Sequence, residues 1–148
     1  CRYLGIEVHR PAIGATLIRL EEMGLENVRL MRGDVRLFLS DFLVGRHFSR
    51  ICMFCPDPWP NDHDRRLACA GVFDLLAERA RPGCRLHLLT DVPDYAAFAR
   101  SELSTSGRWR QSAAVSELDW RSKTRYERRG EARGHPIWEW VGTLVEEG

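Results

Sequence analysis

The stretch "CRLHLLTDVPDYAAFARSELS" (84–104) predicts a strand that leads straight into a helix. Residues 84–91 are an apolar run that closes with Asp91, which is typical of a buried strand. Residues 92–104 carry apolar side chains at helical spacing, and Pro93 stands in the first turn, where proline is tolerated. A strand followed by a helix is half of a βαβ unit, the building block of parallel sheets.

The same alternation of strands and helices runs along most of the chain. Strands are expected at 3–8, 27–34, 50–55, 84–91 and 137–145, and helices at 12–24, 35–43, 67–80 and 92–104, with irregular basic sequence before the last strand. This order predicts an α/β fold with an open, mostly parallel, doubly wound sheet and helices on both faces. It also predicts a single domain over 1–148.

Composition sets outer limits on what the protein does. Of the 148 residues 44% are hydrophobic and 29% charged, as in an ordinary globular domain, and no apolar run approaches membrane-spanning length. Cys52 and Cys55 form a CxxC pair inside a strand, but no second pair completes a zinc site, so we expect reduced cysteines, no metal and a cytoplasmic protein. The stretch 121–133 holds six basic and two acidic residues; it is either an anion-binding patch or a solvated face.

Each of the first four predicted strands ends in a carboxylate: Glu7, Asp34, Asp57 and Asp91. Ligands of open α/β sheets bind at the carboxyl ends of the strands, so these residues predict a shared cleft. Glu7 is placed to accept from ribose hydroxyls or to cap the next helix. Asp34 opens the next helix, where it caps that helix, belongs to the cleft, or does both. Asp57 lies between two prolines that restrict its backbone, so its carboxylate is preorganised for binding.

Five motifs occur in order: "LGIEVHRPAIG" (4–14), "RGD" (32–34), "PDPWP" (56–60), "TDVPDYA" (90–96) and "TRYERRG" (124–130). Together they resemble the bacterial tRNA (guanine-N7)-methyltransferase family, TrmB, over nearly the whole chain. The resemblance implies a Rossmann-like class I methyltransferase fold with S-adenosylmethionine (SAM) as cofactor. It also implies tRNA as partner and 7-methylguanine at position 46 of the variable loop as product.

The resemblance also implies roles for individual residues. Glu7, Asp34 and Asp57 would bind the cofactor, and Asp57 would also be the catalytic carboxylate. The predicted substrate-binding residues are Asn61, Asp91, Thr124, Arg125, Tyr126 and Glu127. His63, Arg65 and Arg66 would contact RNA phosphates, giving an affinity that falls with salt.

The sequence departs from the family in two places. The glycine-rich E-x-G-x-G segment and first strand of the family are missing before "LGIEVHRP". We therefore expect a truncated gene product, inactive as this chain alone, whose sheet has a gap between 3–8 and 50–55. The alternatives are a protein that lost its cofactor loop or one that borrows it from another chain.

The second departure is "PNDHDRR" (60–66), which is shorter and more acidic than the family's basic segment. Asn61 stands where a lysine is expected, and Asp62 and Asp64 replace basic positions. These changes favour the alternative function, a non-catalytic relative that binds RNA or protein. The sequence leaves open whether the protein is a monomer or a homodimer.

Overall fold

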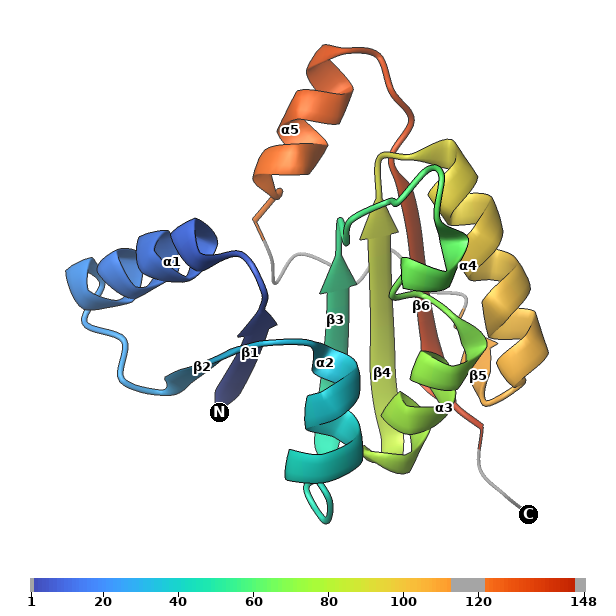
Figure 1. Cartoon of the computed structure of the whole chain (residues 1–148), viewed down its shortest axis with the longest axis horizontal. Coiled ribbons are helices and arrows are strands. Elements are labelled where there is room, and N and C mark those ends of the chain that lie inside the picture. The colour runs from blue at the N-terminus through green and yellow to red at the C-terminus, as the bar shows by residue number, and fades with distance from the viewer. Residues whose placement is uncertain (1, 113–121, 146–148) are drawn as a thin grey trace. The chain divides into compact units, whose positions relative to one another are not determined.

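The computed structural model describes residues 2–112 and 122–145 (Figure 1). The chain divides into two compact units, Cys1–Val44 and Gly45–Gly148. The sequence predicted a gap in the sheet between 3–8 and 50–55, and the strands indeed form two separate sheets, β1-β2 and β3-β4-β6-β5. The expectation of one domain over 1–148 stays a prediction.

The first unit is a βαβ element followed by a short helical segment. It consists of β1 (Tyr3–Glu7), α1 (Arg10–Glu22), β2 (Val28–Arg32), α2 (Val35–Leu37) and the π-helical turn η1 (Phe38–Phe42). β1 and β2 pair in parallel, with Glu7 opposite Arg32 at the last register position. The two strands therefore end at the same edge of this sheet, as the alternation of strand and helix predicted.

The second unit holds the larger, mixed sheet. Its elements are β3 (Phe48–Phe54), the 3-10 turn η2 (His63–Arg65), α3 (Ala70–Glu78), β4 (Ala80–Thr90), α4 (Pro93–Ser106), β5 (Trp109–Gln111), α5 (Arg125–Ala132) and β6 (Trp138–Leu144). β3 and β4 are parallel, whereas β6 runs antiparallel to both β4 and β5. The predicted parallel order is therefore seen in β1-β2 and β3-β4, and the carboxyl-terminal strands reverse it.

Helices α3 and α4 pack on one face of this sheet and form the core with it. The buried side chains of the two helices are Val72, Phe73, Leu76, Ala77, Tyr95, Ala96, Ala99 and Leu103. On the strands Leu86, Leu88 and Trp140 are buried as well. α4 ends at Gly107, whose φ of 64° closes the helix in the left-handed region that suits glycine.

Two sequence-based expectations about elements were wrong. Residues 125–132, taken as irregular, form α5, because Thr124 and Glu127 cap its first turn. The helix expected over 67–80 ends at Glu78, and β4 begins at Ala80, so Pro82 and Gly83 lie within the strand instead of before it. β5, three residues long, was not predicted.

The described cysteines differ in exposure: Cys52 is exposed, Cys55 and Cys69 are partly buried and Cys84 is buried. Burial, and secondarily the nearby Cys52, raises the pKa of Cys84 to about 11. The thiol of Cys84 is therefore neutral at physiological pH. Folding raises the pKa of Cys84, so the neutral thiol stabilises the folded state in full below the unfolded pKa of 9.0. This stabilisation is lost as the pH rises toward about 11.

We expect iodoacetamide at pH 8 to label Cys52 and to leave Cys84 unmodified. Only thiolates react, and Cys84 is both 1% exposed and protonated at that pH. Mass spectrometry of peptides from the native protein checks this, with the denatured protein as the control in which both sites react. Equal labelling of the two residues in the native protein would contradict the burial of Cys84.

Candidate functional site

The segment Cys55–Asp62, here called the Asp57 loop, leaves the carboxyl end of β3 in an unusual backbone conformation. Cys55 has a φ of 46° and Trp59 a φ of 39°, both in the left-handed region that non-glycine residues rarely adopt. Each such residue costs on the order of 1–3 kcal/mol and persists only where the surroundings hold it. Pro56 and Pro58 lie between them, and Asp57 is exposed. The loop therefore presents the Asp57 carboxylate on a stiff backbone.

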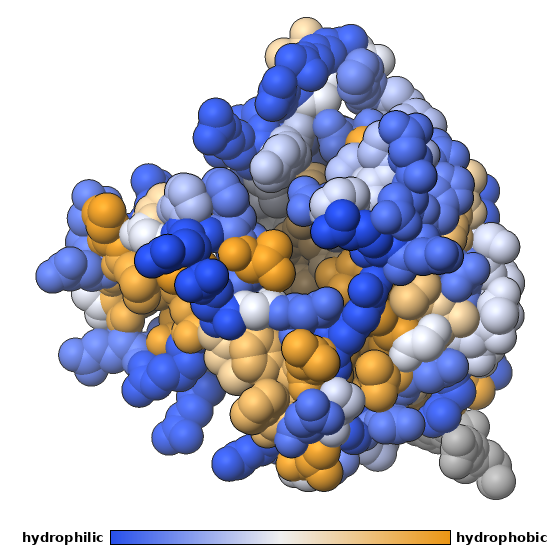
Figure 2. Space-filling model, viewed as in Figure 1, coloured by the Kyte–Doolittle hydropathy of each residue, from blue (hydrophilic) through white to orange (hydrophobic). Residues whose placement is uncertain are grey.

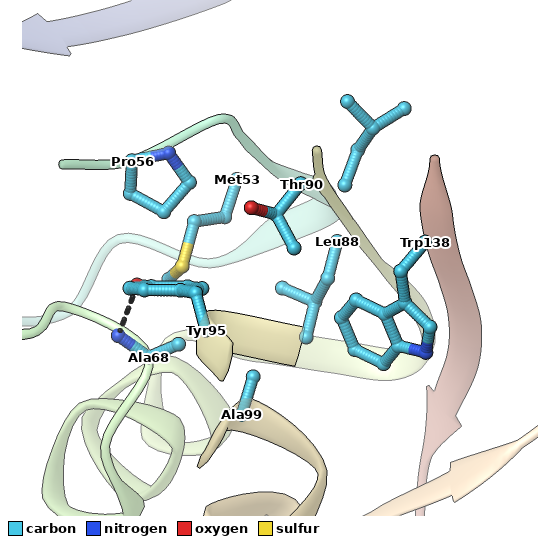
Figure 3. A pocket seen from close by; sticks show the side chains of 9 residues that line it. Met53, Pro56, Ala68, Leu88, Thr90, Tyr95, Ala99 and Trp138 are labelled. Carbon is cyan, nitrogen blue, oxygen red and sulfur yellow. Dashed lines mark hydrogen bonds between the residues drawn. The ribbon is translucent and has the colours of Figure 1, made fainter. Parts of the chain in front are cut away.

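The base of the Asp57 loop is fixed by packing. Pro56 lies over an apolar cluster that includes Met53, Leu88 and Tyr95 and has no room for a water molecule (Figure 3). The hydroxyl of Tyr95 accepts a hydrogen bond from the Ala68 amide at 2.9 Å, drawn as the dashed line in Figure 3. In addition, the amide of Cys55 donates to the carbonyl of Leu89 on β4 at 2.7 Å.

Helix α5 contacts the residues that directly follow β3 and β4. Figure 1 shows the helix beyond the carboxyl ends of these strands. At its amino end the Thr124 hydroxyl lies 3.9 Å from the Cys55 sulfur. Near its carboxyl end Gly130 lies against Asp91, because a Cβ on Gly130 would stand 3.0 Å from the Asp91 Cβ and 3.1 Å from Ile137 Cδ1. The structure thus brings the "PDPWP", "TDVPDYA" and "TRYERRG" motifs together at one edge of the sheet. We call Asp57, Asp91, Thr124 and Glu127 the strand-end cluster.

Within the strand-end cluster, Thr124 and Glu127 hold each other. The Thr124 hydroxyl accepts from the Glu127 amide at 3.1 Å, and a Glu127 carboxylate oxygen accepts from the Thr124 amide at 2.6 Å. Glu127 is only 4% exposed. Both residues therefore have a structural role as a capping box, and their contact with a substrate stays a prediction.

Polar and charged residues of both signs are exposed around this cluster. Arg125 and Tyr126 on α5 are exposed, and Figure 2 shows a hydrophilic surface over this helix. Asn61 and Arg65 are exposed too, and the Arg65 guanidinium stacks on the Trp59 ring at 3.6 Å from its centroid. The stack holds a cation against the Trp59 ring of the Asp57 loop. Arg121, the first residue of the predicted basic stretch, lies outside the described residues.

Arg66 was predicted to contact RNA phosphates, and its position corrects this prediction. Its side chain is fully buried, forms an ion pair with Asp94 and donates from Nε to the Pro58 carbonyl at 2.8 Å. A buried guanidinium with these partners cannot reach a phosphate on the surface. His63, half-exposed, lies 3.9 Å from the Asp94 carboxylate. The hydrogen bond from Arg66 lowers the pKa of Asp94 below its ordinary value, which keeps this carboxylate ionised.

In the first unit, Glu7 is the last residue of β1, and Asp34 follows β2. One Glu7 carboxylate oxygen accepts from the amides of Val8 and His9, at 2.7 and 2.9 Å. Asp34 is the N-cap of α2 and accepts from the Arg36 amide at 2.9 Å. The helix-capping reading of Asp34 is therefore confirmed. That of Glu7 is wrong, because α1 begins at Arg10 with His9 as its N-cap and has no side-chain cap. A carboxylate held in this way at a strand end fits the ribose hydroxyls of a nucleotide-like cofactor.

Among residues 2–112 and 122–145, no group of three or more histidine, cysteine, aspartate or glutamate side chains could hold a metal ion. None of the helices described is both long enough and apolar enough to cross a membrane.

Gly130 is predicted to matter because of its contact with Asp91. Gly130→Ala would push a methyl group into the Asp91 side chain, so we expect displacement of Asp91 and about a tenfold lower activity. Gly71→Ala is the matched control, since no atom lies within 4 Å of a Cβ at that helical position. Steady-state kinetics and thermal melting of both variants measure the effect; a Gly130→Ala enzyme as active as Gly71→Ala would contradict it.

The chain is similar in sequence to known methyltransferases. Residues 1–140 match the Methyltransf_4 family, described as "Putative methyltransferase". The tRNA (guanine-N(7)-)-methyltransferase of Nitrosococcus oceani is 39% identical over 139 residues, which cover 93% of this chain and 59% of the relative. The enzyme of the same name from Nitrosomonas eutropha is 40% identical over 139 residues, covering 91% and 62%. The chain thus spans about three fifths of the length of these relatives.

Solved methyltransferases share the fold. The N-methyltransferase NodS from Bradyrhizobium japonicum WM9 superposes with a TM-score of 0.64 at 14% identity, over 98% of this chain and 74% of that one. An rRNA methylase from Streptococcus thermophilus gives a TM-score of 0.60 at 13% identity, over 98% and 74%. The fold is thus the Rossmann-like α/β fold of methyltransferases, and the chain belongs to the Methyltransf_4 family, with tRNA (guanine-N(7)-)-methyltransferases as sequence relatives, as its motifs predicted.

Proposed function

We propose that the protein transfers a methyl group from SAM to N7 of guanine 46 in the variable loop of tRNA, in the cytoplasm. The observation that carries the proposal is the strand-end cluster, in which three motifs far apart in sequence meet beside an exposed, stiffly held carboxylate. The names of the sequence relatives support the same reaction.

The proposed cofactor fits the carboxylates of the first unit. Glu7 would accept from the ribose hydroxyls, and Asp34 would lie beside the adenine. Bound SAM supplies an electrophilic methyl group on a sulfonium. The chain's own contribution is to orient the two reactants and to stabilise charge.

Guanine N7 carries a lone pair at neutral pH, so no residue has to remove a proton from the nucleophile. As the bond from N7 to the methyl carbon forms and the bond from carbon to sulfur breaks, positive charge moves onto the purine. The Asp57 carboxylate would stabilise this charge and accept from the N1–H and N2–H groups of the guanine. Alignment of N7 with the methyl group accounts for much of the rate.

The substrate RNA would be held by the exposed polar and basic residues around the cluster. Arg65, His63 and the arginines of α5 would contact phosphates, and Asn61, Asp91, Arg125 and Tyr126 would contact the nucleotides near the target. Asp62 and Asp64 oppose phosphate binding, so we expect the family's usual RNA affinity to be reduced here.

The experiment is a deletion of the gene followed by mass spectrometric mapping of its host's tRNA. We expect 7-methylguanine to disappear from position 46 and to return when the gene is restored. Persistence of the modification in the deletion strain, with no second gene for it, would contradict the proposal and would favour a non-catalytic role.

A further inference from the structure

Arg65 and Arg66 are neighbours of identical chemistry in opposite surroundings. Arg65 is exposed and stacks on Trp59, whereas Arg66 is 0% exposed. Taking a guanidinium out of water is costly unless it is paired and hydrogen-bonded. The buried charge of Arg66 therefore has to be stabilised by an ion pair and hydrogen bonds, and these contacts fix the segments that supply them.

The partners of Arg66 come from two separate segments. Nε donates to the carbonyl of Pro58, the residue that directly follows Asp57. The guanidinium also pairs with Asp94 in the first turn of α4 and lies 5.0 Å from the ring centroid of Phe98, one turn further along. One side chain thus ties the Asp57 loop to the start of α4.

The Asp57 loop needs such a restraint. Its left-handed residues, Cys55 and Trp59, are unfavourable by themselves, so the loop would relax if a contact between them were removed. Pro58 has no amide hydrogen to anchor the loop, which leaves its carbonyl as the backbone group available for a bond at that residue. The bond from Arg66 Nε meets that carbonyl at 2.8 Å.

We propose that Arg66 is a positioning residue: with Asp94 it clamps the Asp57 loop onto α4 and so sets where the Asp57 carboxylate points. The clamp itself is independent of the reaction, while its consequence for catalysis rests on the proposed function. Lysine cannot replace arginine here, since a compact ammonium lacks the planar fork that reaches a carbonyl and a carboxylate together.

The clamp is tested first by hydrogen exchange in the protein as the gene encodes it. In Arg66→Lys we expect amides of residues 54–66 to exchange about tenfold faster, with exchange in β4 unchanged. Arg79→Lys is the matched control, because Arg79 is also largely buried and paired, with Glu78 at 3.4 Å, but lies away from the loop. Unchanged exchange at 54–66 in Arg66→Lys would overturn the proposal.

The catalytic consequence is tested by kinetics. A displaced Asp57 lowers kcat by about tenfold to a hundredfold and leaves the KM for tRNA within about twofold, because alignment and not binding is lost. A purely structural role would instead lower the folded fraction and leave kcat per folded molecule unchanged, and that result would overturn the catalytic part.

A second variant keeps the test decisive if Arg66→Lys fails to fold. Asp94→Asn removes the charge partner but leaves the bond from Arg66 to Pro58, so we expect the same changes at smaller size. If the variants exchange faster at 54–66 but the wild type transfers no methyl group to tRNA, the clamp is supported and the proposed function is refuted. If the wild type is active and both variants match it in exchange and in kcat, the clamp is refuted and the proposed function is supported.

Discussion

Replacement of Asp57 by asparagine is expected to lower methyl transfer to tRNA by about 10³-fold without lowering the melting temperature. The side chain is exposed, so the change removes a charge and breaks no packing. If the reaction places positive charge on the guanine, an uncharged amide in the same position loses the stabilisation that the carboxylate provides. The rate is measured with labelled SAM and unmodified tRNA, using the protein as the gene encodes it.

Asp62→Asn is the matched control for this experiment. It makes the same change in charge at another exposed position of the same loop. Its kcat should equal that of the wild type, and its KM for tRNA should stay the same or fall, since a negative charge facing RNA is removed. Wild-type kcat in Asp57→Asn would show that this carboxylate has no part in catalysis.

Glu127→Ala is expected to have the largest effect on local stability near the site. It removes the acceptor of the Thr124 amide, and the loss of a capping interaction costs about 1–2 kcal/mol. α5 is eight residues long, too short to be stable without its caps. We expect trypsin to cleave after Arg128 and Arg129 about tenfold faster, since cleavage follows the population of the opened helix.

Glu131→Ala serves as the control on the same helix. Glu131 is exposed and pairs with Lys123 at the surface, where such pairs contribute about 0–1 kcal/mol. Its effect on cleavage should therefore be at most about fivefold. Similar cleavage of Glu127→Ala and wild type would mean that the capping box does not hold α5 in place.

The parts of the fold that the sequence predicted well are those with strong local patterns. The alternation of apolar runs and helical spacing placed β1 to β4 and α1, α3 and α4 within a few residues of their bounds. The missing glycine-rich segment predicted a gap in the sheet, and the strands form two sheets. α5 was missed because "RYERRGEA" has no apolar stripe; its helix depends on the Thr124 cap and on contacts with distant segments.

The candidate site was predicted in part, and its errors have a common cause. The shared cleft predicted for Glu7, Asp34, Asp57 and Asp91 stays a prediction, while the structure gives contacts from α5 to Asp91 and to Cys55 at the start of the Asp57 loop. Composition, however, does not distinguish two adjacent arginines, and only packing decides that Arg65 faces solvent while Arg66 is buried. The pairing of Asp94 with Arg66 could not be predicted from "TDVPDYA", because an exposed aspartate in the first turn of a helix is usual.

The central claim is that guanine N7 at position 46 receives the methyl group. In the most direct measurement, the protein as the gene encodes it is incubated with labelled SAM and, separately, with each of two tRNAs. The tRNAs differ only at position 46, where one carries guanine and the other 7-deazaguanine, which lacks N7. We predict label in the first tRNA and none in the second. Equal labelling of both tRNAs, or of neither, would contradict the claim.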